Sequence, residues 1–136
     1  MTLRRKAREL ALQFLYGIEV NPGDLEEKLA SFWQMNRTER EIEEFAASLI
    51  RGVVQHKEQI DRTISEHALN WDIQRIIPVD RNMLRLAVYE LAFRPDIPHV
   101  VTINEAVDIA KKFGTAESGK FVNGILDNVR AKLAEA

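Results

Sequence analysis

The segment from 80 to 93 constrains the fold of this chain most, because a helix formed by it is apolar on nearly every side. Its apolar side chains are Met83, Leu84, Leu86, Ala87, Val88, Tyr89, Leu91, Ala92 and Phe93. A helix with this pattern must be covered by other elements. We therefore expect residues 80–93 to form the central helix of a bundle, with Pro78 at its entry.

Helical periodicity also marks the rest of the chain. The first helix should carry an apolar face at steps of three and four from Leu3 to Ile18 and end at Asn21-Pro22-Gly23. Further helices are expected over 24–33, from 38 onward with a break near His56, over 102–113 and over 118–133. No window shows convincing strand alternation, so the sequence predicts an all-α fold of about seven helices.

Two threonine–glutamate pairs have the spacing of a capping box, in which the two side chains close the N-terminus of a helix. Thr38 with Glu41 should open the long amphipathic stretch. Thr102 with Glu105 should open the following helix near the C-terminal end of the chain. Gly114 should then stop that helix.

The length and composition narrow the class of protein. A chain of 136 residues fits a single domain, 1–136, that can bury a core without covalent staples. The absence of cysteine excludes a disulfide framework and thiol catalysis. We see no signal peptide, and no apolar run approaches the roughly 20 residues of a membrane span. These features predict a cytoplasmic protein with no membrane partner.

The basic residues near the start of the chain form the most unusual charge feature. Four of the five residues from 4 to 8 are basic: Arg4, Arg5, Lys6 and Arg8. The N-terminus of a helix carries roughly half a positive charge, so cations there disfavour folding. Such a cluster usually needs an external anion, and nucleic acid is the natural one.

The charge distribution along the chain supports that interpretation. Residues 1–16 carry four bases and one acid, or +3, and residues 111–132 carry five bases and two acids, again +3. Residues 17–110 carry 10 bases and 17 acids, or −7, so the net charge of −2 conceals two basic ends. A basic start can also be only a solvated tail, and that alternative stays open.

Aromatic residues accompany both basic segments. Tyr16 lies two helical turns beyond the first cluster, Phe113 follows Lys112, and Phe121 follows Lys120. Single-stranded RNA is held by cations along its backbone and by aromatic rings that stack on its bases. The alternative is that these rings belong to the core, and the apolar pattern around Phe121 favours the core for that ring.

The segment 114–120 matches the first seven positions of the phosphate-binding motif GxxxxGK, but Phe121 stands where the motif needs Ser or Thr. The motif should also follow a strand, whereas a helix is expected here. The histidines lack a second ligand at metal spacing: His56, His67 and His99. No nucleophile has an evident base, so we expect no enzyme, no metal and no cofactor.

Four segments together resemble the NusB family of bacterial transcription antitermination factors. They are Arg4-Arg5-Lys6-Ala7-Arg8-Glu9 with Tyr16, the run from Val79 to Leu91, Ile103-Asn104-Glu105-Ala106, and the run from Lys120 to Asp127. Each segment alone is weak, but their order and spacing are specific. The resemblance covers nearly the whole chain and implies seven helices in two small packed bundles that form one domain.

The resemblance also implies the function. Family members bind the boxA element of nascent ribosomal RNA transcripts together with NusE, a small-subunit ribosomal protein. The pair joins other Nus factors on RNA polymerase and suppresses premature termination. A homodimer of the free protein is a further possibility within the family.

The family's contact residues carry over by position. The RNA contacts fall on Arg4, Arg5, Lys6, Arg8, Tyr16, Phe113, Glu117, Lys120 and Phe121, to which Lys112 is added as the neighbour of Phe113. The NusE contact falls on Asp80, with Arg81 beside it. The family often has a tyrosine at the RNA face where this chain has His67-Ala68, so that contact is left open.

Two alternatives belong to other classes of protein. A helical protein-interaction module without RNA binding could use the acidic middle of the chain as its docking face. A related fold also occurs as the N-terminal domain of ribosomal RNA cytosine methyltransferases. The length of this chain leads us to expect the free-standing factor.

Overall fold

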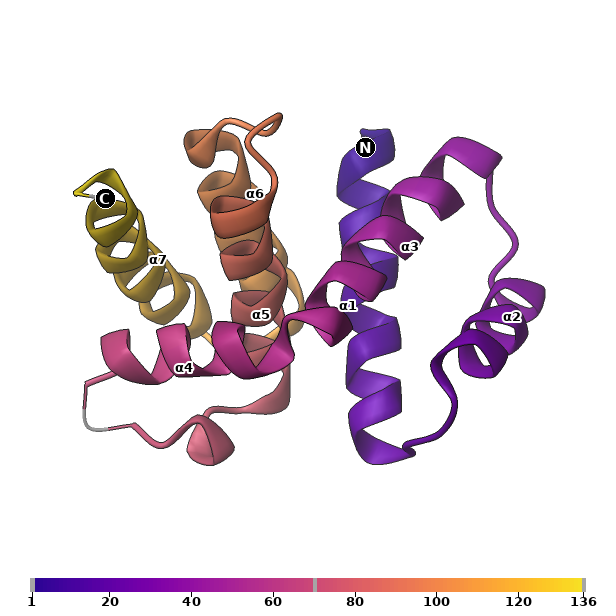
Figure 1. The fold of residues 1–136 in the computed structure, drawn as a ribbon, viewed down its shortest axis with the longest axis horizontal. Coiled ribbons are helices and arrows are strands. Elements are labelled where there is room, and N and C mark those ends of the chain that lie inside the picture. The colour runs from indigo at the N-terminus through magenta and orange to yellow at the C-terminus, as the bar shows by residue number, and fades with distance from the viewer. Residues whose placement is uncertain (1, 70, 136) are drawn as a thin grey trace.

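The computed structural model describes residues 2–69 and 71–135, which form seven α-helices and one short 3-10 helix (Figure 1). The helices are α1 Leu3–Val20, α2 Leu25–Met35, α3 Arg40–Gln55, α4 Lys57–His67, η1 Ile73–Arg75, α5 Pro78–Phe93, α6 His99–Phe113 and α7 Ser118–Ala134. The described residues contain no strand. The prediction of an all-α fold with about seven helices is confirmed.

The helices form two packed bundles that meet along α1 and α5. Figure 1 shows α1, α2 and α3 on one side and α4 to α7 on the other. Helix α5 contacts α1, α3, α4, α6 and α7, and its side chains from Asp80 to Val88 are all buried. The prediction that this segment forms the central helix is therefore confirmed.

Several helix boundaries follow directly from local sequence. Pro78 occupies the first turn of α5, where its missing N–H costs nothing. Gly114 follows the last residue of α6, as predicted. His56 is the single residue between α3 and α4, with φ −108° and ψ 20°, so the predicted break lies at this histidine.

Both predicted capping boxes are wrong. Helix α3 begins after Glu39 without a side-chain capping bond, and the buried Thr38 hydroxyl has no hydrogen-bond partner among the described residues. Helix α6 begins at His99, so Thr102 already lies inside it. The Thr102 hydroxyl donates instead to the Glu90 carboxylate at 2.8 Å, a tertiary contact that overrides the local pattern.

The apolar pattern of α5 conceals a set of buried charges. Arg85 is almost fully buried and donates to Glu19 of α1 at 2.6 Å and to Asp61 of α4 at 2.8 Å. Glu90 is equally buried and pairs with Arg8 of α1. The pairs of Arg85 with Glu19 and of Glu90 with Arg8 join α5 to α1, so they help to fix how the two bundles meet.

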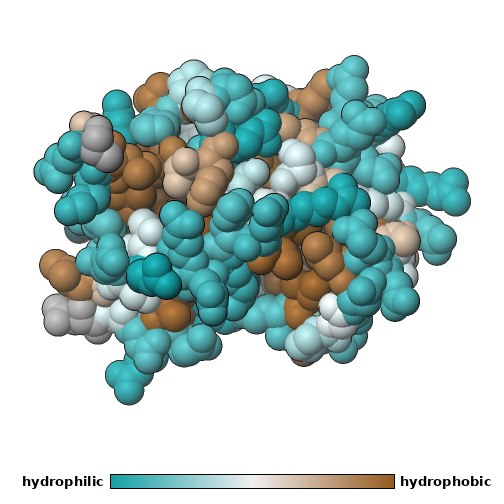
Figure 2. Space-filling model, viewed as in Figure 1, coloured by the Kyte–Doolittle hydropathy of each residue, from teal (hydrophilic) through white to brown (hydrophobic). Residues whose placement is uncertain are grey.

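None of the helices in the described part of the chain combines the length and the apolar character that a membrane span requires. The surface seen in Figure 2 is mostly hydrophilic, with hydrophobic side chains gathered in separate patches.

Candidate nucleic-acid interface

The basic cluster at the start of α1 divides into inward and outward side chains. Arg8 is 2% exposed and donates through Nε and Nη2 to the two carboxylate oxygens of Glu90, at 2.8 and 2.9 Å. Arg5 donates to Glu105 at 2.9 Å and to Asp108 at 3.0 Å. The premise that all four cations need an external anion is therefore wrong for Arg5 and Arg8.

The pair between Arg5 and Glu105 also shifts the pKa values of both groups. The hydrogen bond from Arg5 lowers the pKa of Glu105 despite its partial burial, and the same bond raises the pKa of Arg5. Both members of the pair are thus held in their charged forms at neutral pH. The sequence could not reveal this arrangement, because the partners lie about a hundred residues apart.

Arg4 and Lys6 point outward from the same turns of α1. The Arg4 guanidinium lies 4.4 Å from the centre of the Phe45 ring, and both cationic side chains are exposed. Within the described residues, Lys6 forms no ion pair. The outward half of the basic cluster is therefore available to a phosphate backbone, while the inward half holds α1 against α5 and α6.

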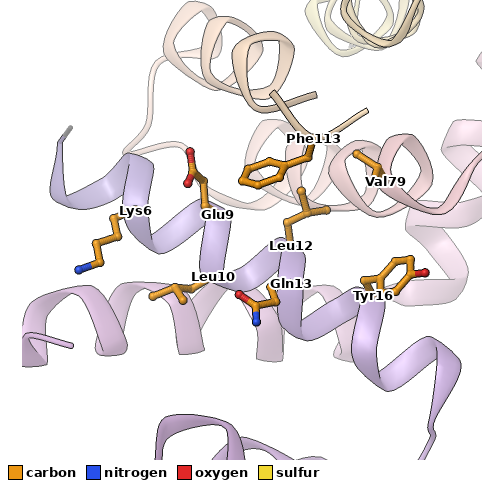
Figure 3. A pocket seen from close by; sticks show the side chains of 8 residues that line it. All are labelled: Lys6, Glu9, Leu10, Leu12, Gln13, Tyr16, Val79 and Phe113. Atoms are coloured by element: carbon orange, nitrogen blue, oxygen red, sulfur yellow. The ribbon is translucent and has the colours of Figure 1, made fainter. Parts of the chain in front are cut away.

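Tyr16 and Phe113, both predicted to contact RNA, lie on the same surface depression. We call it the first groove; its volume is about 500 Å³, and it is lined by Lys6, Glu9, Leu10, Leu12, Gln13, Tyr16, Val79 and Phe113. Figure 3 shows Phe113 reaching from the end of α6 toward Leu12, with Tyr16 farther along α1. Tyr16 is 45% exposed and Phe113 is 47% exposed.

Glu9 lines the first groove and forms an ion pair with Lys112. The Lys112 ammonium lies 3.1 Å from both carboxylate oxygens of Glu9 and 5.1 Å from the centre of the Phe113 ring. The Lys112 side chain is half exposed, whereas the Glu9 side chain is only 14% exposed, so the ion pair is partly buried. Because Lys112 is half exposed, a phosphate could reach its ammonium from solvent.

The remaining aromatic candidate, Phe121, lies on a different depression beside α7. We call it the second groove; its volume is about 460 Å³, and it is lined by His67, Ala68, Leu69, Trp71, Glu117, Lys120, Phe121, Gly124, Ile125 and Asn128. Phe121 is partly buried against the core, as its apolar pattern indicated. Glu117 precedes α7 as an exposed residue whose side chain makes no capping bond.

The two residues predicted to contact NusE lie under the surface. Asp80 is 5% exposed, and burial raises the pKa of its carboxyl. Its Oδ1 atom has no hydrogen-bond partner in the described structure. Arg81 is also buried and pairs with Glu19. In this conformation neither charge is presented to a partner, which differs from the expectation that Asp80 offers its charge at an interface.

The GxxxxGK segment follows a helix, as expected: residues 114–117 connect α6 to α7, and residues 118–120 form the first turn of α7. The Ser118 hydroxyl accepts from the Thr115 backbone N–H at 2.9 Å, which closes the turn on itself. A methyl group at Gly114 would contact Ser118, so the glycine is needed for this turn. The segment thus has a structural reason for its glycine and serine.

Trp71 is the site residue that the sequence reasoning missed. It lines the second groove, is 51% exposed and pairs edge to face with Phe121 at a centroid distance of 5.9 Å. The sequence offered only one signal for Trp71, namely that it is an aromatic residue in a stretch without helical periodicity. Its partner lies 50 residues later in the sequence, so the pairing was not visible.

The fold and the grooves define the class: a small all-α protein of two packed helical bundles, with exposed aromatic rings beside surface lysines. The chain belongs to the NusB family, whose family model matches residues 5–131.

Individual relatives agree with this assignment. The chain is 47% identical over 136 aligned residues to the transcription antitermination protein NusB of Thermodesulfovibrio yellowstonii, with 93% of this chain and 90% of that protein covered. The solved structure of T. maritima NusB matches with a TM-score of 0.87 and 42% identity, covering 97% of this chain and 93% of that one. A structure of the antitermination factors NusB and NusE with double-stranded RNA matches with a TM-score of 0.87 and 32% identity, covering 97% and 98%.

Proposed function

We propose that this chain is an RNA-binding transcription antitermination factor. With NusE it binds the boxA element of nascent ribosomal RNA transcripts and helps RNA polymerase, with other Nus factors, to read through terminators. The observation that carries the proposal is the first groove, where exposed Tyr16 and Phe113 lie beside Lys6 in a member of the NusB family. The relative that was solved with NusE and RNA supports the same pair of partners.

The mechanism is one of binding rather than catalysis. Phosphates of the RNA would contact Arg4, Lys6, Lys112 and Lys120, and unstacked bases would meet Tyr16, Phe113 and Phe121, with Glu117 accepting from a base N–H. Arg5 and Arg8 act as positioning residues, because their carboxylate partners hold the first turns of α1 in place. A rigid scaffold of this kind limits the entropy lost when RNA binds.

The NusE contact is proposed at the start of α5. Asp80 and Arg81 support that surface from beneath, while Val79 reaches the first groove next to Tyr16. Residues 1–136 would act as one domain, because the largest buried cluster includes side chains from both bundles. We propose no catalytic activity and a cytoplasmic location, in keeping with a factor that works on nascent transcripts.

The test is an equilibrium titration of fluorescent boxA RNA with the full chain, alone and with NusE. The expected result is saturable binding to boxA RNA that NusE tightens, together with weaker binding to a scrambled RNA of equal length. A protein-interaction module would bind NusE but neither RNA. That pattern would contradict the proposed function and favour the alternative.

A further inference from the structure

Arg81 and Arg85 lie one turn apart in α5 and share one carboxylate, and both are buried. The Glu19 carboxylate of α1 accepts from Nε and Nη2 of Arg81 and, at 2.6 Å, from Nη1 of Arg85. Burial by itself would raise the pKa of Glu19, but the hydrogen bonds from the two arginines hold that pKa below its usual value. Glu19 is therefore charged at neutral pH and serves as a counter-charge for both arginines.

The remaining donors of the two arginines serve different parts of the molecule. Arg85 directs Nε and Nη2 to the Asp61 carboxylate of α4, at 2.8 and 3.1 Å. Arg81 directs Nη1 to the backbone carbonyl of Ile76 at 2.5 Å and to that of Ile73 at 3.4 Å. Arg81 is thus bonded to the backbone of the turn that precedes α5. Across the described residues, no hydrogen bond joins Arg85 to that turn.

Residues 71–77, which we call the η1 turn, lie mostly at the surface. Trp71 and Arg75 are exposed, whereas Ile76 is buried. The backbone bonds within the turn are short in sequence, as in the 3.3 Å bond from the Ile76 N–H to the Ile73 carbonyl. Because the hydrogen-bond geometry of a 3-10 helix is poor, such a turn depends on tertiary contacts to keep one position.

The η1 turn forms one wall of two depressions. Trp71 lines the second groove, and Arg75 and Ile77 line a smaller cavity of about 170 Å³, which Asp80 also lines. Phe121 borders both depressions and meets the Trp71 indole edge to face. The shape of both depressions therefore depends on where the η1 turn is held.

We propose that Arg81 is a positioning residue that fixes the η1 turn where its exposed side chains meet RNA. The guanidinium of Arg81 spans the two carbonyls of the turn and the Glu19 carboxylate, so it ties the turn to both bundles. A lysine cannot replace it, because an ammonium lacks the planar fork of donors that reaches several acceptors at once. A turn that is already held also limits the entropy lost when RNA binds. The inference rests on the proposed function and adds to it a residue that acts through the turn.

Arg81→Lys and Arg85→Lys form a matched pair of variants. Both keep a positive charge beside Glu19, and both lose part of a buried set of hydrogen bonds, so their melting temperatures should fall to a similar extent. Arg81→Lys should also weaken binding of boxA RNA by about fivefold, the order expected when RNA must immobilise one further side chain. Arg85→Lys should bind boxA RNA as the parent does.

Trp71 reports the position of the η1 turn in the free protein. The chain has two tryptophans, so a Trp33→Phe background leaves Trp71 as the sole tryptophan emitter. In that background, Arg81→Lys should increase the quenching of the emission by acrylamide, because the indole is no longer held against Phe121. The Ile76 amide should also exchange its hydrogen faster in Arg81→Lys, since the turn opens locally. Arg85→Lys should change neither readout.

A neutral double variant covers the case in which Arg81→Lys does not fold. Glu19→Gln with Arg81→Gln removes both charges of the pair together, and Arg85 keeps Asp61 as its counter-charge. No buried charge is then left unpaired. The double variant should weaken binding of boxA RNA and expose Trp71 to acrylamide, as Arg81→Lys does.

The outcomes separate the inference from the proposed function. If the parent binds no boxA RNA, the proposed function fails, and the role of Arg81 in it fails as well. If the parent binds RNA while Arg81→Lys matches Arg85→Lys in affinity, quenching and exchange, the proposed function stands and the inference is wrong. A loosened η1 turn with unchanged RNA affinity would also overturn the inference, because RNA would then not depend on the position of the turn.

Discussion

Arg8 and Glu90 form a buried two-point ion pair, with Nε and Nη2 of the arginine 2.8 and 2.9 Å from the two carboxylate oxygens. The pair joins α1 to α5 and is extended by the hydroxyl of Thr102, which donates to the same carboxylate. It therefore ties the basic start of the chain to the central helix. The buried Arg8 thus positions the turns of α1 that carry the exposed Arg4 and Lys6.

Glu90→Gln should destabilise the protein strongly, because the buried Arg8 guanidinium loses its two-point partner and keeps only Glu105, 3.4 Å from Nη1, as a counter-charge. We expect a loss of about 3–5 kcal/mol in the free energy of unfolding, measured by urea denaturation. Glu44→Gln is the control, since its pair with Arg40 is exposed and should contribute less than about 1 kcal/mol. Equal losses in the two variants would show that the buried pair has no special role.

Removing the outward cations should weaken RNA binding and leave the fold intact. For Arg4→Ala combined with Lys6→Ala, the logarithmic salt dependence of boxA RNA affinity should flatten by about 1.4, the value for two lost phosphate contacts on a single strand. Arg37→Ala with Arg40→Ala removes two exposed arginines elsewhere on the first bundle and should leave the slope unchanged. Equal flattening in both double variants would indicate diffuse attraction instead of defined contacts.

Asp80 should respond to substitution as a buried group. Burial raises the pKa of its carboxyl in the folded state above the value in the unfolded chain. The folded state therefore takes up a proton at a higher pH than the unfolded state does. The free energy of unfolding should accordingly rise as the pH falls through the raised pKa. Asp80→Asn should remove this dependence and fold well. Asp80→Lys should lose about 3 kcal/mol or more, because it places an ammonium in the same site.

The Asp80 variants also test how NusE is bound. Because the Asp80 side chain is buried, Asp80→Asn should bind NusE as the parent does in a calorimetric titration at a temperature where both are folded. A large loss of affinity in the folded Asn variant would mean that the charge itself meets NusE, as the sequence had led us to expect.

Acid should weaken the link between α1 and α6. The hydrogen bond from Arg5 lowers the pKa of Glu105, so the stabilisation is present above about pH 4.3, the usual glutamate value, and is lost as the pH falls through the lowered pKa. Urea denaturation of the parent and of Glu105→Gln between neutral pH and about pH 3 measures this. The parent should lose more stability on acidification than the variant; parallel curves would exclude the pair as a source of acid sensitivity.

Local sequence was sufficient for most of the fold. The periodicity of apolar residues located the helices, and Pro78 and Gly114 placed two of their ends, because backbone constraints at these residues act over one turn. The capping boxes failed for the opposite reason. Thr102 had a better partner in Glu90, which is near it only in the folded chain.

The candidate site was harder to predict from the sequence than the fold was. Tyr16 and Phe113 were chosen separately for their basic neighbours, and the fold places both on the first groove. Charge counting could not distinguish Arg8 from Lys6, since only tertiary structure shows which cation turns inward. Trp71 was invisible for the same reason, because its groove exists only once α7 packs beside the end of α4.

The most direct test of the account is ultraviolet crosslinking of boxA RNA to the full chain in the presence of NusE, with the crosslinked residues identified by mass spectrometry. We predict crosslinks at Tyr16 and Phe113 on the first groove and at Trp71 or Phe121 on the second. Tyr16→Leu should abolish the crosslink at position 16 while the protein stays folded. Crosslinks confined to α2 and α3, or none at RNA concentrations that saturate binding, would contradict the claim that these aromatic grooves hold the RNA.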